Sequence, residues 1–239
     1  MSDRYFLPQF PDGERQGNEC ALTGSEFHHL AHVMRKGVGD CLTVFDGQGT
    51  EADAEIVGIA KTCATLCLAE RRSDAPQTHA NVVLATAAPK ADRMRWLVEK
   101  ATELGVERLI PLQTSRSIVA PGAFKLDKMR QVVVEACKQS GRNRLMQIDL
   151  LMPWRQFVAE RVSSLATIVA DRDGSPLASL DLSALERASV LLVIGPEGGL
   201  SATELQEAVE AGAKTVSLGS NILRIETAAL ALAAVFLMR

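Results

Sequence analysis

The pattern of apolar and polar residues divides the chain near residue 72. Before that point, segments with alternating or continuous apolar character predict short β-strands. These segments are Cys41–Phe45, Thr50–Val57 and Ala64–Ala69, and the turn sequence Asp46–Gly49 separates the first two. One helix is expected among them, from Ser25 to Arg35, with Ser25 as its N-cap. Residues 1–72 therefore favour a small β-barrel, and the polar, proline-containing segment 73–80 is interpreted as a linker.

From residue 81 onward, strand-like and helix-like segments alternate. The apolar runs that predict strands are Val82–Ala87, Leu109–Leu112, Ile148–Leu151, Thr167–Ala170, Val190–Ile194 and Thr215–Leu218. The predicted helices are Lys90–Leu104, Lys125–Ser140, Ser201–Ala211 and Glu226–Met238. Such alternation is typical of an α/β domain with a mainly parallel sheet and helices on both faces. The last helix is apolar on every side from Ala228 to Met238, so it is expected to be buried in the core or in a subunit interface.

The overall composition is that of an ordinary globular protein. Of the 239 residues, 47% are apolar and 23% are charged, and the formal net charge is -3. A nucleic-acid partner would therefore have to meet a local basic patch. Aromatic residues make up only 4% of the chain, which argues against a single-strand binder built on stacking platforms.

The cysteines, the amino terminus and the longest apolar run favour a cytoplasmic location. The five cysteines are odd in number, lack Cys-x-x-Cys spacing and are interpreted as buried thiols in a reducing compartment. The start Met1-Ser-Asp-Arg-Tyr5 has no apolar signal core. The run from Ala228 to Met238 is well short of the roughly 20 residues that a bilayer requires.

Two glycine turns are the strongest indication of a ligand site. They lie within Ile194–Glu204 and Leu218–Ala228, and each follows an apolar run and precedes a helix. Parallel strands end at a common edge of the sheet, where α/β domains bind ligands. The sequence Ser201-Ala-Thr-Glu204 fits a capping box, and the free amides of such a helix start can bind a polar or anionic group. For either turn alone, a simple tight turn remains the alternative.

Several other chemistries are disfavoured by missing motifs. Neither Gly-x-Gly-x-x-Gly after a strand nor Gly-x-x-x-x-Gly-Lys-[Ser/Thr] is found, which disfavours dinucleotide enzymes and phosphate-loop NTPases. No Gly-x-Ser-x-Gly elbow supports a serine nucleophile. The residues His28, His29 and His32 have helical spacing, but no carboxylate completes a ligand set, so no metal is predicted.

Charged residues supply the candidates for catalysis and RNA binding. Arg224 and Glu226 flank the start of the last helix, where the helix dipole favours a carboxylate. A capping acid beside a surface arginine is the alternative. Basic residues cluster at Arg4, at Lys90, Arg93 and Arg95, and at Lys138, Arg142 and Arg144. Each cluster alone is typical of a solvated face, whereas the three together suit contacts with RNA phosphates.

Motifs along the whole chain resemble one known family. They are Gly195-Pro-Glu-Gly-Gly199, Leu218-Gly-x-x-Ile-Leu-Arg-x-Glu-Thr-Ala228, Glu135-Ala-Cys-Lys-Gln-Ser-Gly-Arg142 and Asp92-Arg-Met-x-Trp-Leu-Val-x-Lys-Ala-Thr-Glu-Leu-Gly105, with Arg4-Tyr-Phe6 and His28-His-Leu-x-His-Val-x-Arg35 near the start. This set resembles the RsmE family, whose members are 16S ribosomal RNA uridine N3-methyltransferases of the SPOUT class.

The resemblance implies a fold, a cofactor and partners. The fold would be a PUA-like, RNA-binding β-barrel over residues 1–72 and a SPOUT α/β methyltransferase domain with a deep trefoil knot over residues 81–239. The protein would be a homodimer that uses S-adenosyl-L-methionine to methylate uracil N3 of a specific uridine in 16S rRNA of the small ribosomal subunit. The cofactor-binding residues carried over are Gly195, Glu197, Gly198, Leu218, Gly219, Ile222 and Leu223.

Two departures from the family pattern concern the second glycine turn. Ser220-Asn221 stands where the family usually has Pro-Arg, and Ile225 stands where it has threonine. A loop without the proline is softer, and a loop without the arginine lacks one cation for cofactor or RNA.

A mechanistic hypothesis follows from the resemblance. Arg224 is expected to stabilise the uracil anion, and Glu226 is expected to act as base or as anchor of the helix start. The residues expected to contact RNA are Arg4, Lys90, Arg93 and Arg142. A SPOUT-type RNA ribose 2′-O-methyltransferase and a non-catalytic RNA-binding relative remain the alternative functions.

Overall fold

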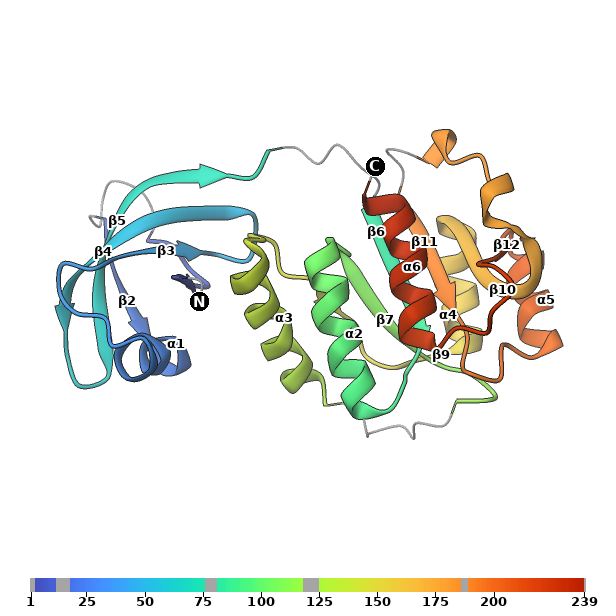
Figure 1. The fold of residues 1–239 in the computed structure, drawn as a ribbon, viewed down its shortest axis with the longest axis horizontal. Helices are drawn as coiled ribbons and strands as arrows, with labels where there is room; N and C mark the ends of the chain where they lie inside the picture. The colour runs from blue at the N-terminus through green and yellow to red at the C-terminus, as the bar shows by residue number, and fades with distance from the viewer. Residues whose placement is uncertain (1–2, 12–17, 76–80, 118–124, 186–188, 239) are drawn as a thin grey trace. The chain divides into compact units, whose positions relative to one another are not determined.

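A computed structural model describes residues 3–11, 18–75, 81–117, 125–185 and 189–238. The chain forms two compact units, which are drawn in Figure 1. The first unit contains Met1–Pro76 together with Cys137–Leu145, and the second contains Gln77–Ala136 and Met146–Arg239. The sequence analysis assigned Cys137–Leu145 to the second part of the chain, so its place in the first unit is a tertiary feature.

The first unit is built on a five-stranded sheet. Its strands are β1 (Arg4–Phe6), β2 (Glu19–Thr23), β3 (Cys41–Phe45), β4 (Thr50–Ile59) and β5 (Cys63–Ser73). They lie in the order β1-β3-β4-β5-β2, with β1 parallel to β3 and the other pairs antiparallel. The alternation in β4 and β5 turns every second side chain inward, so that Ala54, Ile56 and Leu66 are buried in a common core.

The helix predicted from Ser25 to Arg35 differs from the structure in its start and its form. It begins one residue earlier as α1 (Gly24–His28), with Thr23 at the cap position, so the prediction of Ser25 as N-cap is wrong. Gly24 has a φ of 62°, a conformation that glycine adopts readily, and the chain turns there into the helix. A π-helical segment, η1 (His29–Val33), follows and buries Leu30.

The segment Cys137–Leu145 is attached to the first unit by backbone and side-chain contacts. The Leu145 amide donates to the Gly47 carbonyl at 3.0 Å, and the Gly49 amide donates to the Asn143 carbonyl at 3.1 Å. Lys138 is buried, and its Nζ lies 3.3 Å from the Glu26 carboxylate. The helical periodicity of residues 125–140 does not show that this segment packs against the first unit, because periodicity identifies the apolar face of a helix but not the residues that cover it.

The second unit is a parallel sheet with helices on both faces, as the alternation predicted. Its strands are β6 (Asn81–Ala87), β7 (Arg108–Gln113), β8 (Gln147–Ile148), β9 (Met152–Pro153), β10 (Ala166–Pro176), β11 (Ser189–Ile194) and β12 (Lys214–Ser217). The order is β12-β10-β11-β6-β7-β8, and β9 also pairs with β7. Every one of these pairs is parallel. Of the strand predicted at Ile148–Leu151, only Ile148 lies in a strand, β8, and the next short strand, β9, begins after Leu151.

The α-helices described in this unit are α2 (Ala91–Leu104), α4 (Trp154–Arg161), α5 (Ala202–Glu210), α6 (Ile225–Leu237) and, as far as Ala136, α3 (Leu126–Ser140). α6 packs against α2, β6 and β11, whereas α4 packs against β7 and α5. α4, which the sequence analysis did not predict, buries Trp154 and Phe157 against alternate residues of the central strands. The 3₁₀ segments Val162–Ser164, Leu177–Ser179 and Ser183–Leu185 complete the described elements.

α6 was expected to be buried on every side, and in the single chain it is not. One face, which includes Ala229, Leu232 and Phe236, is buried in the core. Along another face, Ala231 and Met238 are exposed and Leu230, Ala234 and Val235 are half-buried. The helix therefore presents an apolar strip that the chain itself leaves open.

The cysteines are free thiols, as predicted, but they are not uniformly buried. Cys137 is buried, Cys20, Cys63 and Cys67 are half-buried, and Cys41 is exposed at the start of β3. Among the described residues, no helix has the length and apolar character needed to cross a membrane.

Candidate active site

A cavity of about 380 Å³ lies at the carboxyl ends of β10, β11 and β12. Three segments form its wall: the end of the first half of β10, the first glycine turn after β11 and the second glycine turn after β12. The lining residues are Ala170–Asp173, Ile194–Leu200, Ser217–Gly219, Asn221–Leu223, Ile225 and Ala228. All seven residues that the sequence analysis assigned to a cofactor are among them.

The first turn is a tight loop closed by the start of α5. The Gly199 amide donates to the Pro196 carbonyl at 2.8 Å, and Gly199 has a φ of 70°, a region that favours glycine. A side-chain carbon at Gly195 would lie 3.0 Å from the Leu200 amide nitrogen. A positive φ at Gly199 and close contact at Gly195 both favour glycine, which explains why these positions of the turn are glycines.

The capping box predicted at Ser201 and Glu204 is confirmed. The Glu204 amide donates to Ser201 Oγ at 3.2 Å, and the Ser201 amide donates to Glu204 Oε2 at 2.8 Å. The reciprocal bonds satisfy two backbone donors at the start of α5. They also fix the direction in which the chain leaves the first turn.

Glu204 additionally anchors the turn that follows β7. Its Oε1 accepts the Ser115 amide at 2.7 Å, and its Oε2 accepts the Ser115 hydroxyl at 3.0 Å. Burial of Glu204 disfavours the charged carboxylate, but the hydrogen bonds from Ser115 and Ser201 outweigh it and hold the pKa of Glu204 below its usual value. Beside this contact, Arg116 Nη1 donates to the Gly198 carbonyl at 2.6 Å. The β7 turn and the first glycine turn are thus joined by two residues, which the sequence analysis did not foresee.

The second turn places the two predicted catalytic residues at the start of α6. Gly219 has a φ of 124°, and Ile222 is an apolar side chain that is 80% exposed beside the cavity. Of the two departures from the family pattern, Asn221 lines the cavity and Ser220 does not. Arg224 is exposed at the N-cap position, and Glu226 is buried in the first turn of α6.

Arg93 lies between the two glycine turns. Its Nη1 is 3.4 Å from Glu197 Oε1, and its Nε is 3.8 Å from Glu226 Oε1. The sequence analysis expected Arg93 to contact RNA, and the structure places it beside two carboxylates of the site. The other oxygen of Glu226, Oε2, is buried and has no hydrogen-bond partner among the described residues.

The segment Asp171–Asp173 is a part of the cavity wall that the sequence analysis missed. It follows the apolar part of β10, and the Asp173 amide donates to Asp171 Oδ1 at 2.9 Å. A charged run directly after the apolar half of a parallel strand is the signal that would have located it, because that part of the strand reaches the ligand edge of the sheet.

Comparison with known proteins identifies the family of this chain. A family model described as an RNA methyltransferase domain matches residues 76–237, and one described as an RNA methyltransferase PUA domain matches residues 22–65. The chain is 31% identical over 237 residues to ribosomal RNA small subunit methyltransferase E of Bacillus subtilis, covering 95% of this chain and 93% of that protein. The chain belongs to the ribosomal RNA small subunit methyltransferase E family. The member from Synechocystis sp. is 36% identical over 212 residues, which cover 87% of this chain and 69% of that protein.

Solved structures agree with the assignment of the methyltransferase. The family member from Neisseria gonorrhoeae, bound to S-adenosyl methionine, superimposes with a TM-score of 0.87 at 28% identity and covers 98% of this chain and 96% of that one. A protein of Legionella pneumophila described as a methyltransferase in complex with the same cofactor gives a TM-score of 0.85 at 28% identity and covers 99% and 97%. The fold expected from the sequence, a PUA-like domain followed by a SPOUT-like α/β domain, is confirmed by these matches.

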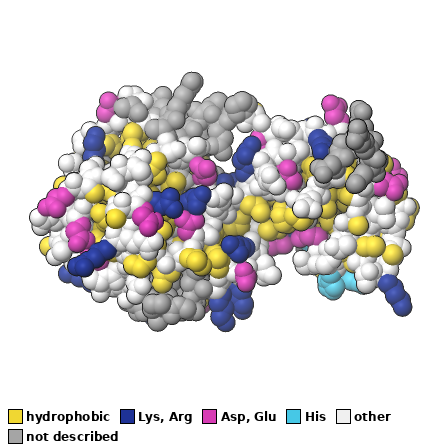
Figure 2. Space-filling model, turned by 180° about the vertical axis from the view of Figure 1, so that it is seen from behind, with side chains coloured by type: hydrophobic (Ala, Val, Ile, Leu, Met, Phe, Trp, Pro, Cys, Tyr) yellow, Lys and Arg dark blue, Asp and Glu magenta, His cyan; other side chains and the backbone are white. Residues whose placement is uncertain are grey.

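The basic residues expected to contact RNA lie in different surroundings in this methyltransferase. Lys90 is exposed directly before α2, and Arg142 is half-buried. Figure 2 shows Lys and Arg side chains scattered among acidic ones over the face in view. Such interspersed charge agrees with the small net charge of -3.

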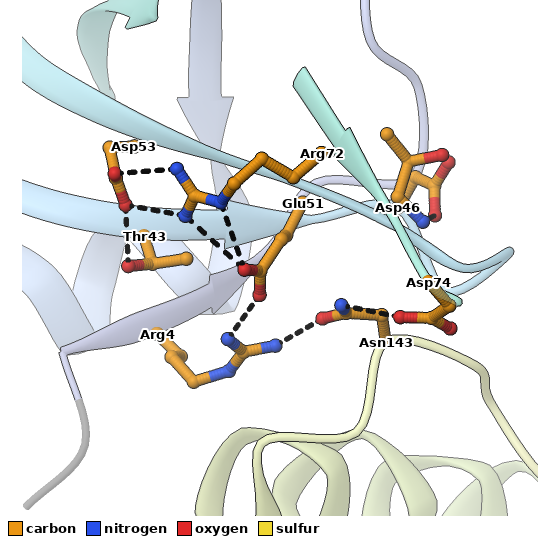
Figure 3. A network of polar contacts seen from close by, with 9 residues as sticks. Arg4, Thr43, Asp46, Glu51, Asp53, Arg72, Asp74 and Asn143 are labelled. Carbon is orange, nitrogen blue, oxygen red and sulfur yellow. Dashed lines mark hydrogen bonds and ion pairs between the residues drawn. The ribbon is translucent and has the colours of Figure 1, made fainter. Parts of the chain in front are cut away.

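Arg4 belongs to a polar network inside the first unit (Figure 3). Its Nη1 is 2.7 Å from Glu51 Oε2, its Nη2 donates to Asn143 Oδ1, and the side chain is 15% exposed. Hydrogen bonding from Arg4 is the main cause that lowers the pKa of Glu51. Asn143 Nδ2 in turn donates to Asp74 Oδ1 at 2.8 Å. Both terminal nitrogens of Arg4 therefore bind groups of the first unit, whereas its Nε is buried and has no hydrogen-bond partner among the described residues.

The three histidines near the amino terminus do not assemble a metal site with other ligands. His28 and His32 have ring centroids 4.9 Å apart, but the described part of the methyltransferase contains no group of three or more His, Cys, Asp or Glu residues that could hold a metal ion.

Proposed function

We propose that this enzyme transfers the methyl group of S-adenosyl-L-methionine to N3 of a specific uridine in 16S rRNA of the small ribosomal subunit. The observation that carries the proposal is the cavity formed by the two glycine turns, in a chain whose Neisseria gonorrhoeae relative is bound to S-adenosyl methionine. Family membership supports the choice of substrate, because the relatives are ribosomal RNA small subunit methyltransferases.

The cavity fits a cofactor of this kind. Its volume of about 380 Å³ lies within the range of small-molecule sites, roughly 300–1,000 Å³. Residues of the two turns supply most of the wall, and the proposed binding residues are Gly195, Glu197, Gly198, Leu218, Gly219, Ile222 and Leu223. The exposed side chain of Ile222 gives an apolar surface on which part of the cofactor can pack.

The chemistry requires a proton to leave N3 before the methyl group arrives. When bound, the cofactor supplies an electrophilic methyl group, and the new N3–carbon bond forms as the sulfur–carbon bond breaks. N3 lies on the pairing edge of uracil, so the base must be unpaired or flipped out to reach the site. Glu226, in the first turn of α6, is the group proposed to accept the N3 proton, and Arg224 is proposed to stabilise the resulting uracil anion.

Substitution of Arg224 tests this assignment. Arg224→Ala is expected to abolish methyl transfer and to leave cofactor binding, measured by calorimetry, near the wild-type value, because Arg224 is not among the lining residues of the cavity. Arg155→Ala, which removes an exposed arginine of α4, is the matched control and is expected to retain activity. Retained turnover in Arg224→Ala would refute the role of this residue.

Product analysis tests the reaction itself. Mass spectrometry of digested RNA distinguishes 3-methyluridine from a ribose-methylated nucleoside, and a ribose product would refute the proposed reaction in favour of the 2′-O alternative. Primer extension across rRNA locates the modified nucleotide, because N3 methylation blocks base pairing and stops reverse transcriptase. This stop should be present with wild-type rRNA and absent with rRNA from a knockout strain. Absence of cofactor binding would instead favour a non-catalytic relative.

Homodimerisation is the partner proposal that the structure supports most directly. The apolar strip on α6, with Leu230, Ala231, Ala234, Val235 and Met238, is the surface proposed to be covered by a second copy of the chain. Sedimentation equilibrium tests the dimer, and a monomer at micromolar concentration would contradict it. The trefoil knot and the cytoplasmic location stay predictions of the sequence.

A further inference from the structure

Arg93 stands at an electrostatically unfavourable place in its own helix. It lies in the first turn of α2, where the helix dipole favours anions and disfavours cations. Two carboxylates outside the helix, those of Glu197 and Glu226, lie near the positive charge of Arg93 and offset this unfavourable interaction. Those carboxylates belong to the first glycine turn and to the start of α6, which are far away in the sequence.

The sheet explains why these three segments meet. β6 and β11 are parallel neighbours, and Thr86 near the end of β6 pairs with Ile194 at the end of β11. The segments that follow both strands therefore leave the sheet at the same edge, and α6 packs against both strands and against α2. As a result Arg93 faces Glu197 on one side and Glu226 on the other.

The three side chains differ in exposure in a way that indicates their roles. Glu197 is 40% exposed and lines the cavity, whereas Glu226 is 9% exposed and is not among the lining residues. Arg93 is 37% exposed and is not among the lining residues, so it does not face the cofactor directly. It connects the wall of the cavity to the proposed proton acceptor.

Glu226 depends on Arg93 for electrostatic compensation. A buried carboxylate is costly unless a cation or hydrogen-bond donors compensate it. The strands β6 and β11, which pack against α6, carry no ionisable side chains. On α2, Glu99 and Glu103 pair with Lys100. In the described segments Arg93 is the cation within 4 Å of Glu226.

We propose that Arg93 is a positioning residue for methyl transfer, which joins Glu197 of the cofactor turn to Glu226 at the start of α6. The bridge fixes the proton acceptor relative to the wall against which the cofactor lies. This role rests on the proposed function, and it takes the place of the RNA contact that the sequence suggested for Arg93.

Variants of Arg93 separate the two roles. Arg93→Gln is expected to lower the single-turnover rate of methyl transfer by tenfold or more at saturating RNA and cofactor. The slope of log Kd for RNA against log salt is expected to stay unchanged. Arg93→Lys, which keeps the charge, is expected to recover most of the rate. Arg155→Gln, at an exposed position of α4 and outside the basic clusters, is the matched control and is expected to keep the wild-type rate.

The opposite pattern overturns the inference. A phosphate contact would leave the saturated rate unchanged and would reduce the salt slope by about 1 in Arg93→Gln. A double variant with Glu197→Gln should be no slower than Arg93→Gln alone, because the two residues act as one bridge, and additive losses would contradict this.

If Arg93→Gln does not fold, Glu197→Gln removes the other end of the bridge, and a wild-type single-turnover rate in that variant overturns the inference. A wild-type enzyme that forms no 3-methyluridine refutes the proposed function instead. The two failures are therefore distinguishable.

Discussion

The anchoring of the cofactor turn by Glu204 gives the sharpest test of the structure. Glu204 is buried, and its two oxygens accept four hydrogen bonds: two from the amides of Ser115 and Ser201 and two from the hydroxyls of the same residues. Glu204→Gln keeps the size of the side chain but replaces one acceptor oxygen by a donor group. The hydroxyls can rotate to accept from the new amide, whereas a backbone N–H cannot.

The expected cost follows from this count. At least one partly buried backbone N–H, of Ser201 or of Ser115, loses its acceptor, and leaving such a donor unsatisfied costs about 1–3 kcal/mol. The remaining bond no longer involves a charged acceptor and loses roughly half its strength, about 1 kcal/mol. Glu204→Gln should therefore lower the free energy of unfolding of the second unit by about 2–4 kcal/mol at neutral pH.

Tryptophan fluorescence in a urea titration measures this loss in the correct unit. The chain has 2 tryptophans, Trp96 in α2 and Trp154 in α4, so the signal comes from the second unit alone. Trp154 is buried, and its Nε1 donates to Glu207 Oε2 at 2.9 Å on the helix that carries Glu204. Its environment therefore reports on the attachment of α5.

The pH dependence supplies a second, independent check. The folded pKa of Glu204 lies below the unfolded value of about 4.3, so its stabilisation is complete above that value and is lost as pH falls through the folded pKa. The difference between the wild type and Glu204→Gln should thus be largest near neutral pH and shrink in acid. Glu210→Gln, an exposed position at the other end of α5, is the control. A difference below 0.5 kcal/mol, or one that persists unchanged in acid, would refute the reasoning.

Two further substitutions test other parts of the structure. Gly174→Ala should lower the Tm of the second unit by roughly 3–10 °C, because the added carbon would lie 2.7 Å from the Val216 amide nitrogen. Gly198→Ala, whose nearest contact would be a flexible Arg116 carbon at 3.6 Å, should leave the Tm unchanged, and equal shifts would contradict the steric argument. Asn143→Ala removes the link between Arg4 and Asp74 and should accelerate hydrogen exchange in β4 by tenfold or more; unchanged exchange would show that the network adds no local stability.

Local sequence features predicted the elements of the second unit well. Ser201 and Glu204 predicted the start of α5 correctly, because a capping box involves only residues that are close in the sequence. The end of α2 at Gly105 follows similarly from a left-handed glycine. α4 escaped prediction because Trp154–Arg161 is short and only weakly amphipathic, so its helical form depends on the burial of Trp154 and Phe157.

The candidate site was predicted in part. Both glycine turns were located correctly as two walls of one cavity, since each follows a parallel strand and such strands end at a common edge. The third wall, Asp171–Asp173, and the attachment of the first turn through Ser115 and Arg116 were not predicted. Those contacts depend on the order of the strands in the sheet, and the periodicity of apolar residues along the chain does not determine that order.

The sequence by itself determined the alternation of strands and helices, the glycine turns and the membership of the family, because these reside in short-range patterns and motif spelling. The tertiary structure alone decided the partners of the charged residues. Arg93 and Glu197 are 104 positions apart, and they meet only because β6 and β11 are adjacent in the sheet. Arg4 meets Asn143 only because residues 137–145 fold onto the first unit. The sequence does not show which charged side chains will pair until the fold brings two distant segments together, and here it brings Arg4 to Glu51 and Arg93 to Glu197.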